Sequence, residues 1–191
     1  MDKIVFDIET KNFFPDIGVN DPASLDISVV CIFNYRDNTY SSFLEKDLKK
    51  LWPILEKAGM LIGYNSDHFD IPLLNKYYPG DLTNIRSLDL LKEIKKSYGR
   101  RVKLDQVAEA TLNLKKSGSG LEANLWWKKG EIDKIINYCL QDVRITKELY
   151  EHVLKNRELK FKEGGKIIPI KIDTSGWEKM HQNGITHSLP F

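Results

Sequence analysis

The chain has 191 residues, a length typical of one domain, and 41% of them are hydrophobic, which is enough for a buried core. A formal net charge of +2 is too small to indicate a nucleic-acid partner by itself, and it does not exclude one. No apolar run approaches the roughly 18 residues that a membrane span needs, so we expect no membrane association. The N-terminus enters a strand without the leader of a signal peptide, and Cys31 and Cys139 stand far apart in apolar surroundings. We therefore expect reduced thiols and a cytoplasmic location.

The first third of the chain predicts a sheet that begins as a meander. Alternating or β-branched apolar residues indicate strands, and apolar residues at intervals of three and four indicate a helix. The expected elements are strands at residues 3–9, 28–35 and 39–44, a loop at 11–26, a turn at 36–38, a helix at 47–57 and a buried strand at 60–63. Short links between the first three strands favour antiparallel pairing.

The middle of the chain alternates helix and strand and then becomes helical. The expected elements are a loop at residues 64–68, a helix with Pro72 in its first turn, a short strand at 87–90, helices at 91–98 and 105–112 with Asp105 as an N-cap, a Gly/Ser/Lys linker at 115–120 and a long helix at 131–155. Three antiparallel strands followed by alternating helix and strand predict an α/β fold with a mixed sheet.

The last part of the chain changes character. Residues 159–162 and 167–172 flank Gly164-Gly165, which is a two-residue hairpin signal. Pro169 would confine the second of these strands to an edge. Residues 174–191 are mostly polar and form either a loose tail or a docking segment, and the pattern leaves both readings open.

Four acidic residues stand where predicted elements begin or end. Asp7 and Glu9 project from one face of the first strand because strand side chains alternate with period two. Asp70 lies at the start of a helix, and Asp142 follows Tyr138 by four residues on the long helix, so those two side chains share a face. If the four carboxylates converge, they cannot all stay ionised without bound cations.

Oxygen-only ligands suit hard cations, so we expect two divalent ions, Mg²⁺ or Mn²⁺, at this site. Two such ions could clamp a phosphate during attack by water, which is the design of a phosphodiesterase. Asp7, Glu9 and Asp142 would hold one ion, Asp70 would act on the other through water, and Tyr138 would hold the attacking water or the phosphate.

The three segments resemble the three motifs of the DEDD superfamily of 3′–5′ exonucleases, the proofreading-type nucleases with an RNase H-like fold. Asp7-Ile-Glu9-Thr10 is similar to the first motif and Asn65-x-x-x-Phe69-Asp70 to the second. Tyr138-x-x-x-Asp142 is similar to the third motif in its tyrosine branch. The histidine branch would place His five residues before the last Asp, where this chain has Asn137.

The resemblance covers residues 1–155 and implies an exonuclease domain there, with residues 156–191 as a C-terminal extension. It implies an RNase H-like mixed five-stranded sheet with the first strand at its centre, flanked by helices, and the hairpin beyond it. It further implies two divalent metal ions, a single-stranded DNA or RNA 3′ end as the partner, and release of nucleoside 5′-monophosphates. Two alternatives stay open: an inactive nucleic-acid-binding module and an endonuclease on the same fold. Oligomeric state and sugar preference are open.

In similar nucleases the residues after the first motif touch the terminal nucleotide. The candidate substrate-binding residues are Thr10, Asn12, Phe13, Phe14 and Asn65. An aromatic ring there could stack on a base, which is worth about 1–3 kcal/mol. The phenylalanines could equally fill the core below the loop, and Asn65 could bond its own backbone.

For other polar and aromatic residues, a structural role competes with a functional one. Asp67 and His68 adjoin the second motif, whereas Asp89 and Asp105 are expected to be structural, and Trp126-Trp127 is expected to pack against the final helices. The densest basic run consists of Lys92, Lys95, Lys96, Arg100, Arg101 and Lys103, and Lys115, Lys116, Lys128 and Lys129 add to it. They predict either phosphate tracking or a solvated face.

Overall fold

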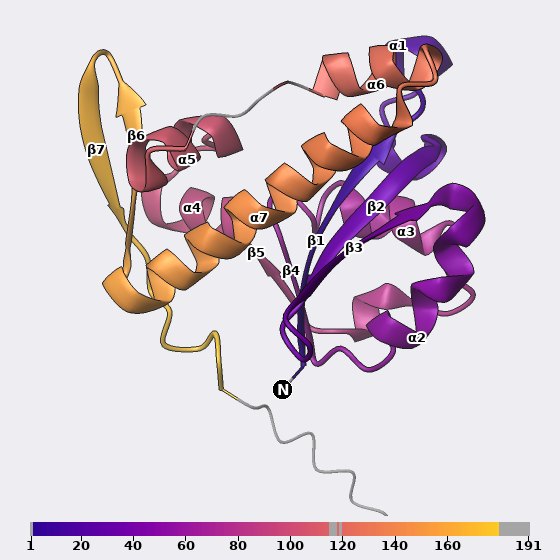
Figure 1. Ribbon diagram of the computed structural model, residues 1–191. Helices are drawn as coiled ribbons and strands as arrows, with labels where there is room; N and C mark the ends of the chain where they lie inside the picture. Colours follow the sequence, from indigo (N-terminus) through magenta and orange to yellow (C-terminus); the bar gives the residue numbers. More distant parts are fainter. Residues whose placement is uncertain (1, 115–117, 119, 180–191) are drawn as a thin grey trace, which may run out of the picture.

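A five-stranded sheet forms the centre of the protein, whose computed structural model describes residues 2–114, 118 and 120–179 (Figure 1). The strands are β1 (Lys3–Thr10), β2 (Ile27–Asn34), β3 (Thr39–Leu44), β4 (Met60–Gly63) and β5 (Ser87–Asp89). Their order across the sheet is β3-β2-β1-β4-β5. The first three strands pair antiparallel, and β4 and β5 continue parallel to β1. The expected mixed sheet with the first strand at its centre is confirmed.

Helices cover both faces of the sheet. They are α1 (Phe14–Ile17), α2 (Trp52–Leu55), α3 (Asp70–Asn75), α4 (Leu90–Tyr98), α5 (Leu104–Leu112), α6 (Gly120–Lys128) and α7 (Ile132–Asn156), with 3-10 turns η1 (Pro22–Ser24), η2 (Glu45–Lys50) and η3 (Leu82–Asn84). Figure 1 shows α7 crossing one face of the sheet, with α2 and α3 on the other. Among the described residues no helix is both long and apolar enough to cross a bilayer.

The alternation of side chains along β1 separates two cores. Ile4, Phe6 and Ile8 are buried among residues of η2, α2 and α3, whereas Val5 is buried against α4, α5 and α7. Asp7 shares the face of Val5 because strand side chains alternate, and so does Glu9. The central strand therefore presents both carboxylates toward the long helix.

Several local expectations were wrong or incomplete. The helix expected at residues 47–57 is the 3-10 turn η2 followed by the short helix α2, where Pro53 lacks the N–H that a continuous helix would need. Asp105 lies in the first turn of α5, and its N-cap is Lys103 in extended backbone conformation. The loop expected at 11–26 contains α1 and η1. Of the expected linker, residues 115–117 and 119 lie outside the described part, and α6 begins at Gly120.

The C-terminal hairpin is formed by β6 (Glu158–Glu163) and β7 (Lys166–Lys171). Gly164 and Gly165 both have positive φ, 55° and 77°, as a tight hairpin turn of this kind requires. Leu159, Phe161 and Ile170 are buried in the same core as α7, so the hairpin packs on the body of the protein. Of the predicted tail, residues 180–191 lie outside the described part.

Candidate active site

The carboxylates of β1 and α7 meet at the end of the central strand. Asp7, Glu9 and Asp142 each offer an oxygen, and these oxygens lie within 4.8 Å of one another. We call these three residues the acidic group. A register shift between Glu9 and Thr10 against β2 marks a bulge, and bulges add local twist where a strand must re-aim its side chains. The Cys139 thiol contacts the carbonyl oxygen of Asp7 at 3.3 Å, which ties α7 to β1 beside the site.

Asp70 lies next to the acidic group but outside it. It is the first residue of α3, its side chain is only 4% exposed, and it accepts a hydrogen bond from the backbone N–H of Ile8. Burial first, and then the negative charges of Asp89 and Asp142, raise the pKa of Asp70 to about 8. A carboxyl in this position releases its proton readily only when a positive charge is brought close to it.

Tyr138 lies one helical turn before Asp142 on α7 and is nearly buried. Burial, the three charges of the acidic group and a hydrogen bond to Asp142 all raise the pKa of its hydroxyl above the ordinary value for tyrosine. The hydroxyl therefore stays protonated and can act as a hydrogen-bond donor. The ring of Trp126 stands edge-on to the Tyr138 ring at 6.0 Å between centroids and fixes its orientation.

A tight loop between β4 and α3 carries the second motif. A side chain at Gly63 would place its Cβ 2.4 Å from the Cβ of Ser66, so the loop can close only over glycine. Asn65 adopts the left-handed conformation with φ of 68°. Asp89, at the end of β5, accepts hydrogen bonds from the backbone N–H groups of Asn65 and Asp67, and also caps α4 through Leu91 and Lys92. Sequence reasoning placed Asp89 among structural residues but did not identify this anchoring role.

A hollow of about 300 Å³ adjoins the acidic group, and we call it the β1 hollow. It is lined by Ile8, Glu9, Thr10, Phe13, Phe14, Leu25, Asn65, Phe69 and Gly120. Two of its lining rings, Phe14 and Phe69, pack edge to face with centroids 6.2 Å apart. The structure thus places four of the five candidate substrate-binding residues in one hollow that Glu9 also reaches.

Asn12, the fifth candidate, does not line this hollow. Its side chain accepts a hydrogen bond from the backbone N–H of Asp26 and donates one to the Asp26 carboxylate. The Thr10 hydroxyl donates to the carbonyl oxygen of Asn12. These bonds hold the segment after β1 against the start of β2, which gives Asn12 a positioning role.

Helix α6 borders the β1 hollow through Gly120, its first residue. The sequence did not predict this helix. Asn124, which is buried, donates a hydrogen bond to the carbonyl oxygen of Lys11. The ammonium group of Lys11 stands over the ring of Trp127 at 5.1 Å. Both tryptophans also pack against the α7-side core. The signal for α6 was weak because two of its apolar residues, Leu121 and Leu125, are exposed.

A family model for the RNase H superfamily matches residues 4–154, so this chain belongs to that superfamily. Among solved structures, it is similar to the family B DNA polymerase from the hyperthermophilic archaeon Pyrobaculum calidifontis, with a TM-score of 0.63 and 19% identity. The match covers 81% of this chain and 24% of the polymerase, so the chain spans about a quarter of that protein's length. At this identity the likeness shows the fold alone. No protein with a curated description matches the chain.

The donor set of the acidic group fits a divalent metal ion. Three carboxylate oxygens from two elements lie close together, and a hard cation such as Mg²⁺ or Mn²⁺ prefers such ligands. Burial first, and then nearby negative charges, raise the pKa of Asp70, and a cation bound beside it would favour its ionised form. An RNase H-like fold with an acidic group on its central strand supports a nuclease that acts on nucleic acid.

Proposed function

We propose that the protein is a metal-dependent 3′–5′ exonuclease of the tyrosine branch of the DEDD superfamily. It would remove nucleoside 5′-monophosphates from the 3′ end of single-stranded DNA or RNA. The observation that carries this proposal is the meeting of Asp7, Glu9 and Asp142 beside the β1 hollow. A hollow of about 300 Å³ next to the reacting groups has room for a single terminal nucleotide, which favours action at an end.

Two divalent ions fit this proposal. Asp7, Glu9 and Asp142 would hold one ion, and Asp70 would reach a second through water. When bound, such ions lower the pKa of the attacking water and neutralise charge on the phosphate. In this scheme the water would release one proton as its oxygen bonds to phosphorus, the bond to O3′ of the preceding nucleotide would break, and O3′ would take up one proton.

The chain's own residues position the reactants in this scheme. The Tyr138 hydroxyl, kept protonated by its surroundings, donates a hydrogen bond to the attacking water or to a phosphate oxygen. Phe14 and Phe69 offer ring surfaces to the terminal base, worth about 1–3 kcal/mol for a stacked base. Asn65 lines the hollow, and its amide oxygen accepts a hydrogen bond from Arg101.

We also propose that residues 1–155 form the nuclease domain, residues 156–191 its extension, and the cytoplasm its location. The boundary lies at the end of α7, after which the chain turns into the hairpin. Cys31 and Cys139 are both free and buried, which agrees with a reducing compartment.

The test uses single-stranded DNA and RNA labelled at the 5′ end, with Mg²⁺, Mn²⁺ or EDTA. We expect a ladder that shortens from the 3′ end one nucleotide at a time, and no cleavage in EDTA. Asp142→Asn should abolish cleavage, because it removes a ligand charge at constant shape, whereas Asp105→Asn on the surface should not. A circular single strand should resist, since only an endonuclease can cut it. Cleavage by Asp142→Asn at the wild-type rate would refute the proposal, and binding without cleavage would favour the inactive-module reading.

A further inference from the structure

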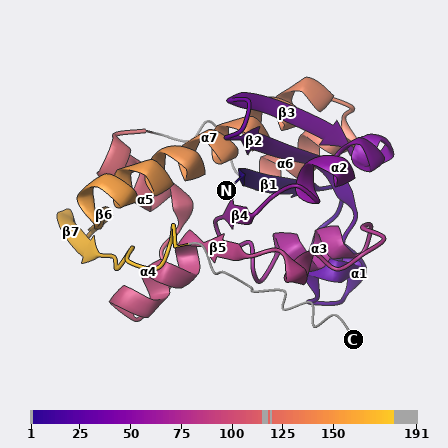
Figure 2. The same cartoon turned by 90° about the horizontal axis from the view of Figure 1, so that it is seen from below.

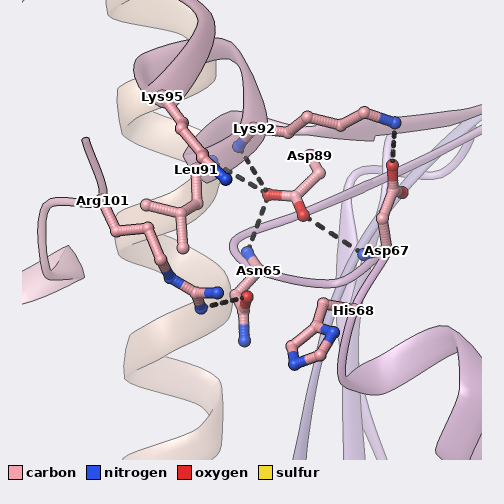
Figure 3. A pocket seen from close by; sticks show the side chains of 8 residues that line it. All are labelled: Asn65, Asp67, His68, Asp89, Leu91, Lys92, Lys95 and Arg101. Carbon is pink, nitrogen blue, oxygen red and sulfur yellow. Dashed lines mark hydrogen bonds and ion pairs between the residues drawn. The ribbon is translucent and has the colours of Figure 1, made fainter. Parts of the chain in front are cut away.

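A second hollow, of about 260 Å³, lies on the far side of the Asn65 loop (Figure 3). We call it the α4 hollow. Its lining residues are Asn65, Asp67, His68, Asp89, Leu91, Lys92, Lys95 and Arg101. Asn65 also lines the β1 hollow, so this residue borders both cavities. A strand whose end occupies the β1 hollow would therefore meet the α4 hollow next.

The acids of the α4 hollow are already satisfied by the protein. Asp89 accepts four backbone N–H groups, as Figure 3 shows around its carboxylate. Asp67 is paired with Lys92 at 2.8 Å and accepts a hydrogen bond from the Ser87 hydroxyl. Asp67 is therefore paired with a cation, whereas Asp89 is held by neutral backbone N–H groups.

Two cations of the same hollow are not paired with a carboxylate of the protein. Within residues 2–114, 118 and 120–179, Lys95 and Arg101 have no carboxylate partner within 4 Å. Arg101 donates a 2.6 Å hydrogen bond to the neutral amide oxygen of Asn65, which holds its guanidinium at the junction with the β1 hollow. Three cations, Lys92, Lys95 and Arg101, face the two carboxylates of Asp67 and Asp89, so the hollow has a formal charge of +1 that favours an anion.

Arg101 also borders a third hollow, of about 240 Å³, at the turn of the C-terminal hairpin. Lys162 and Gly164 contribute to it from the hairpin. Arg100 is fixed there by an ion pair with Glu163 and by its position over the rings of Tyr98 and Phe161. Arg100 thus joins the hairpin to the end of α4, while Arg101 faces the hollows.

We propose that these three hollows form one track for the phosphodiester backbone of a single strand, running from the acidic group past Arg101 to the hairpin. The proposal rests on the proposed function and deepens it. It assigns Lys95 and Arg101 to phosphates upstream of the terminal nucleotide and Lys162 to a more distant one. The extension, which lies outside the superfamily match at residues 4–154, thereby becomes part of the substrate site.

The test measures binding without cleavage, by fluorescence anisotropy of 5′-labelled strands in EDTA over a range of salt concentrations. An octanucleotide is long enough to enter the track, whereas a nucleoside 5′-monophosphate, measured by competition, fills the β1 hollow alone. Arg101→Gln and Lys95→Gln should each weaken octanucleotide binding about tenfold. Each should also reduce the slope of log K against log salt by about 0.7, the value for one lost phosphate contact on a single strand. Mononucleotide binding should not change.

Lys46→Gln is the matched control, because Lys46 lies on η2, which packs on the other face of the sheet. Lys95→Gln guards against an indirect effect through Asn65, since Arg101 bonds that residue and Lys95 does not. Arg101→Lys, which keeps the charge, should restore part of the salt slope. Lys162→Gln should weaken the octanucleotide but not a tetranucleotide.

Failure of the track and failure of the proposed function give different results. Equal octanucleotide binding by wild type, Arg101→Gln and Lys95→Gln would overturn the track even if the wild type cleaves DNA or RNA with Mn²⁺. Binding that depends on Arg101 in a protein that cleaves nothing would support the track and refute the nuclease. A mononucleotide that binds as tightly as the octanucleotide, and as dependently on Arg101, would assign the hollow to a free nucleotide and also overturn the track.

Discussion

The ring and the hydroxyl of Tyr138 have different roles: the ring packs against its neighbours, and the hydroxyl donates a hydrogen bond in the reaction that we propose. The ring contacts Trp126, and the hydroxyl is held by Asp142 next to the acidic group. Tyr138→Phe keeps the packing and removes the donor. We expect single-turnover cleavage with Mn²⁺ to fall by about 10- to 100-fold, because a mispositioned water or phosphate costs rate of this order. Stability should change by only about 1 kcal/mol, the net worth of one hydrogen bond.

Tyr40→Phe is the matched control for this variant, because Tyr40 is 43% exposed and lies on the edge strand β3, away from the acidic group. It should cleave at the wild-type rate. If Tyr138→Phe also cleaves at that rate, the hydroxyl has no part in the reaction and Tyr138 serves only in packing.

Because the pKa of Asp70 is raised, we expect the stability of the metal-free protein to fall as the pH rises. Its pKa is about 8 in the folded chain, mainly through burial, and 3.8 is its ordinary value. Between these values the folded state keeps a proton that the unfolded state releases. The contribution of Asp70 to stability is therefore complete below the unfolded pKa and is lost as the pH rises through the folded pKa.

The measurement is urea unfolding in EDTA at pH 5, 6, 7 and 8, with Asp70→Asn beside the wild type. The neutral amide does not titrate, so the variant should gain stability relative to the wild type as the pH rises. The relative gain should have a slope of at most about 1.4 kcal/mol per pH unit. A constant difference across this range would show that Asp70 ionises normally. Added Mn²⁺ should stabilise the wild type most at pH 8.

At the scale of residues, the sequence correctly predicted which side chains share a face of one element, because local periodicity controls this. Period two on β1 placed Asp7 and Glu9 together, and a spacing of four on α7 did the same for Tyr138 and Asp142. That β1 and α7 bring these pairs into one group is a tertiary fact, and only the resemblance to known motifs anticipated it. The role of Asn124 follows from a contact 113 residues away in the chain, which no local pattern reports.

At the scale of elements, α4 and the second-motif loop depend on one buried carboxylate. Asp89 caps the helix and also holds the N–H groups of Asn65 and Asp67. Asp89→Ala should lower the free energy of unfolding by about 3 kcal/mol, from a lost cap of about 1 kcal/mol and the stranded N–H groups. It should also slow cleavage, because Asp70 follows this loop directly. Urea unfolding and single-turnover kinetics measure the two effects.

Two further variants test this explanation. Asp89→Asn keeps an acceptor oxygen and should recover most of the lost stability. Asp81→Ala removes an exposed cap of η3, where Asp81 accepts from the N–H of Thr83, and should cost no more than about 1 kcal/mol. An Asp89→Ala protein as stable as wild type would show that water replaces the carboxylate and that the loop is held elsewhere.

Elements with strong, continuous patterns were predicted well and those with short or interrupted patterns were not. The strands β3 and β4 have the expected limits. β4 is a compact buried apolar run, whereas β3 is an exposed edge strand delimited by the turn before it and by η2 after it. Pro53 divides the expected helix at residues 47–57, and α6 buries so little of its apolar surface that its periodicity is faint. The cap of α5 depends on the extended backbone of Lys103, which residue type does not dictate.

At the scale of the whole molecule, the segment after β7 joins distant parts of the fold. Figure 2 shows it running from the hairpin toward β5. The guanidinium of Arg86 donates hydrogen bonds to the carbonyl oxygens of Gly176 and Lys179. Lys3 at the start of β1 pairs with Glu178 at 2.6 Å. The described part of the predicted tail, up to residue 179, is therefore a docked segment that closes the chain back onto the central strand.

Trp177 is the buried centre of this closure. It is 4% exposed and stacks on Tyr150 of α7 with the rings 8° from parallel and centroids 5.9 Å apart. Trp177→Ala should lower the free energy of unfolding by about 3–5 kcal/mol, the usual cost of removing a buried aromatic side chain. Trp177→Phe should lose less than Trp177→Ala, because it keeps a stacked ring. Urea unfolding followed by circular dichroism measures both. If Trp177→Ala unfolds at the wild-type urea concentration, the segment contributes nothing to stability.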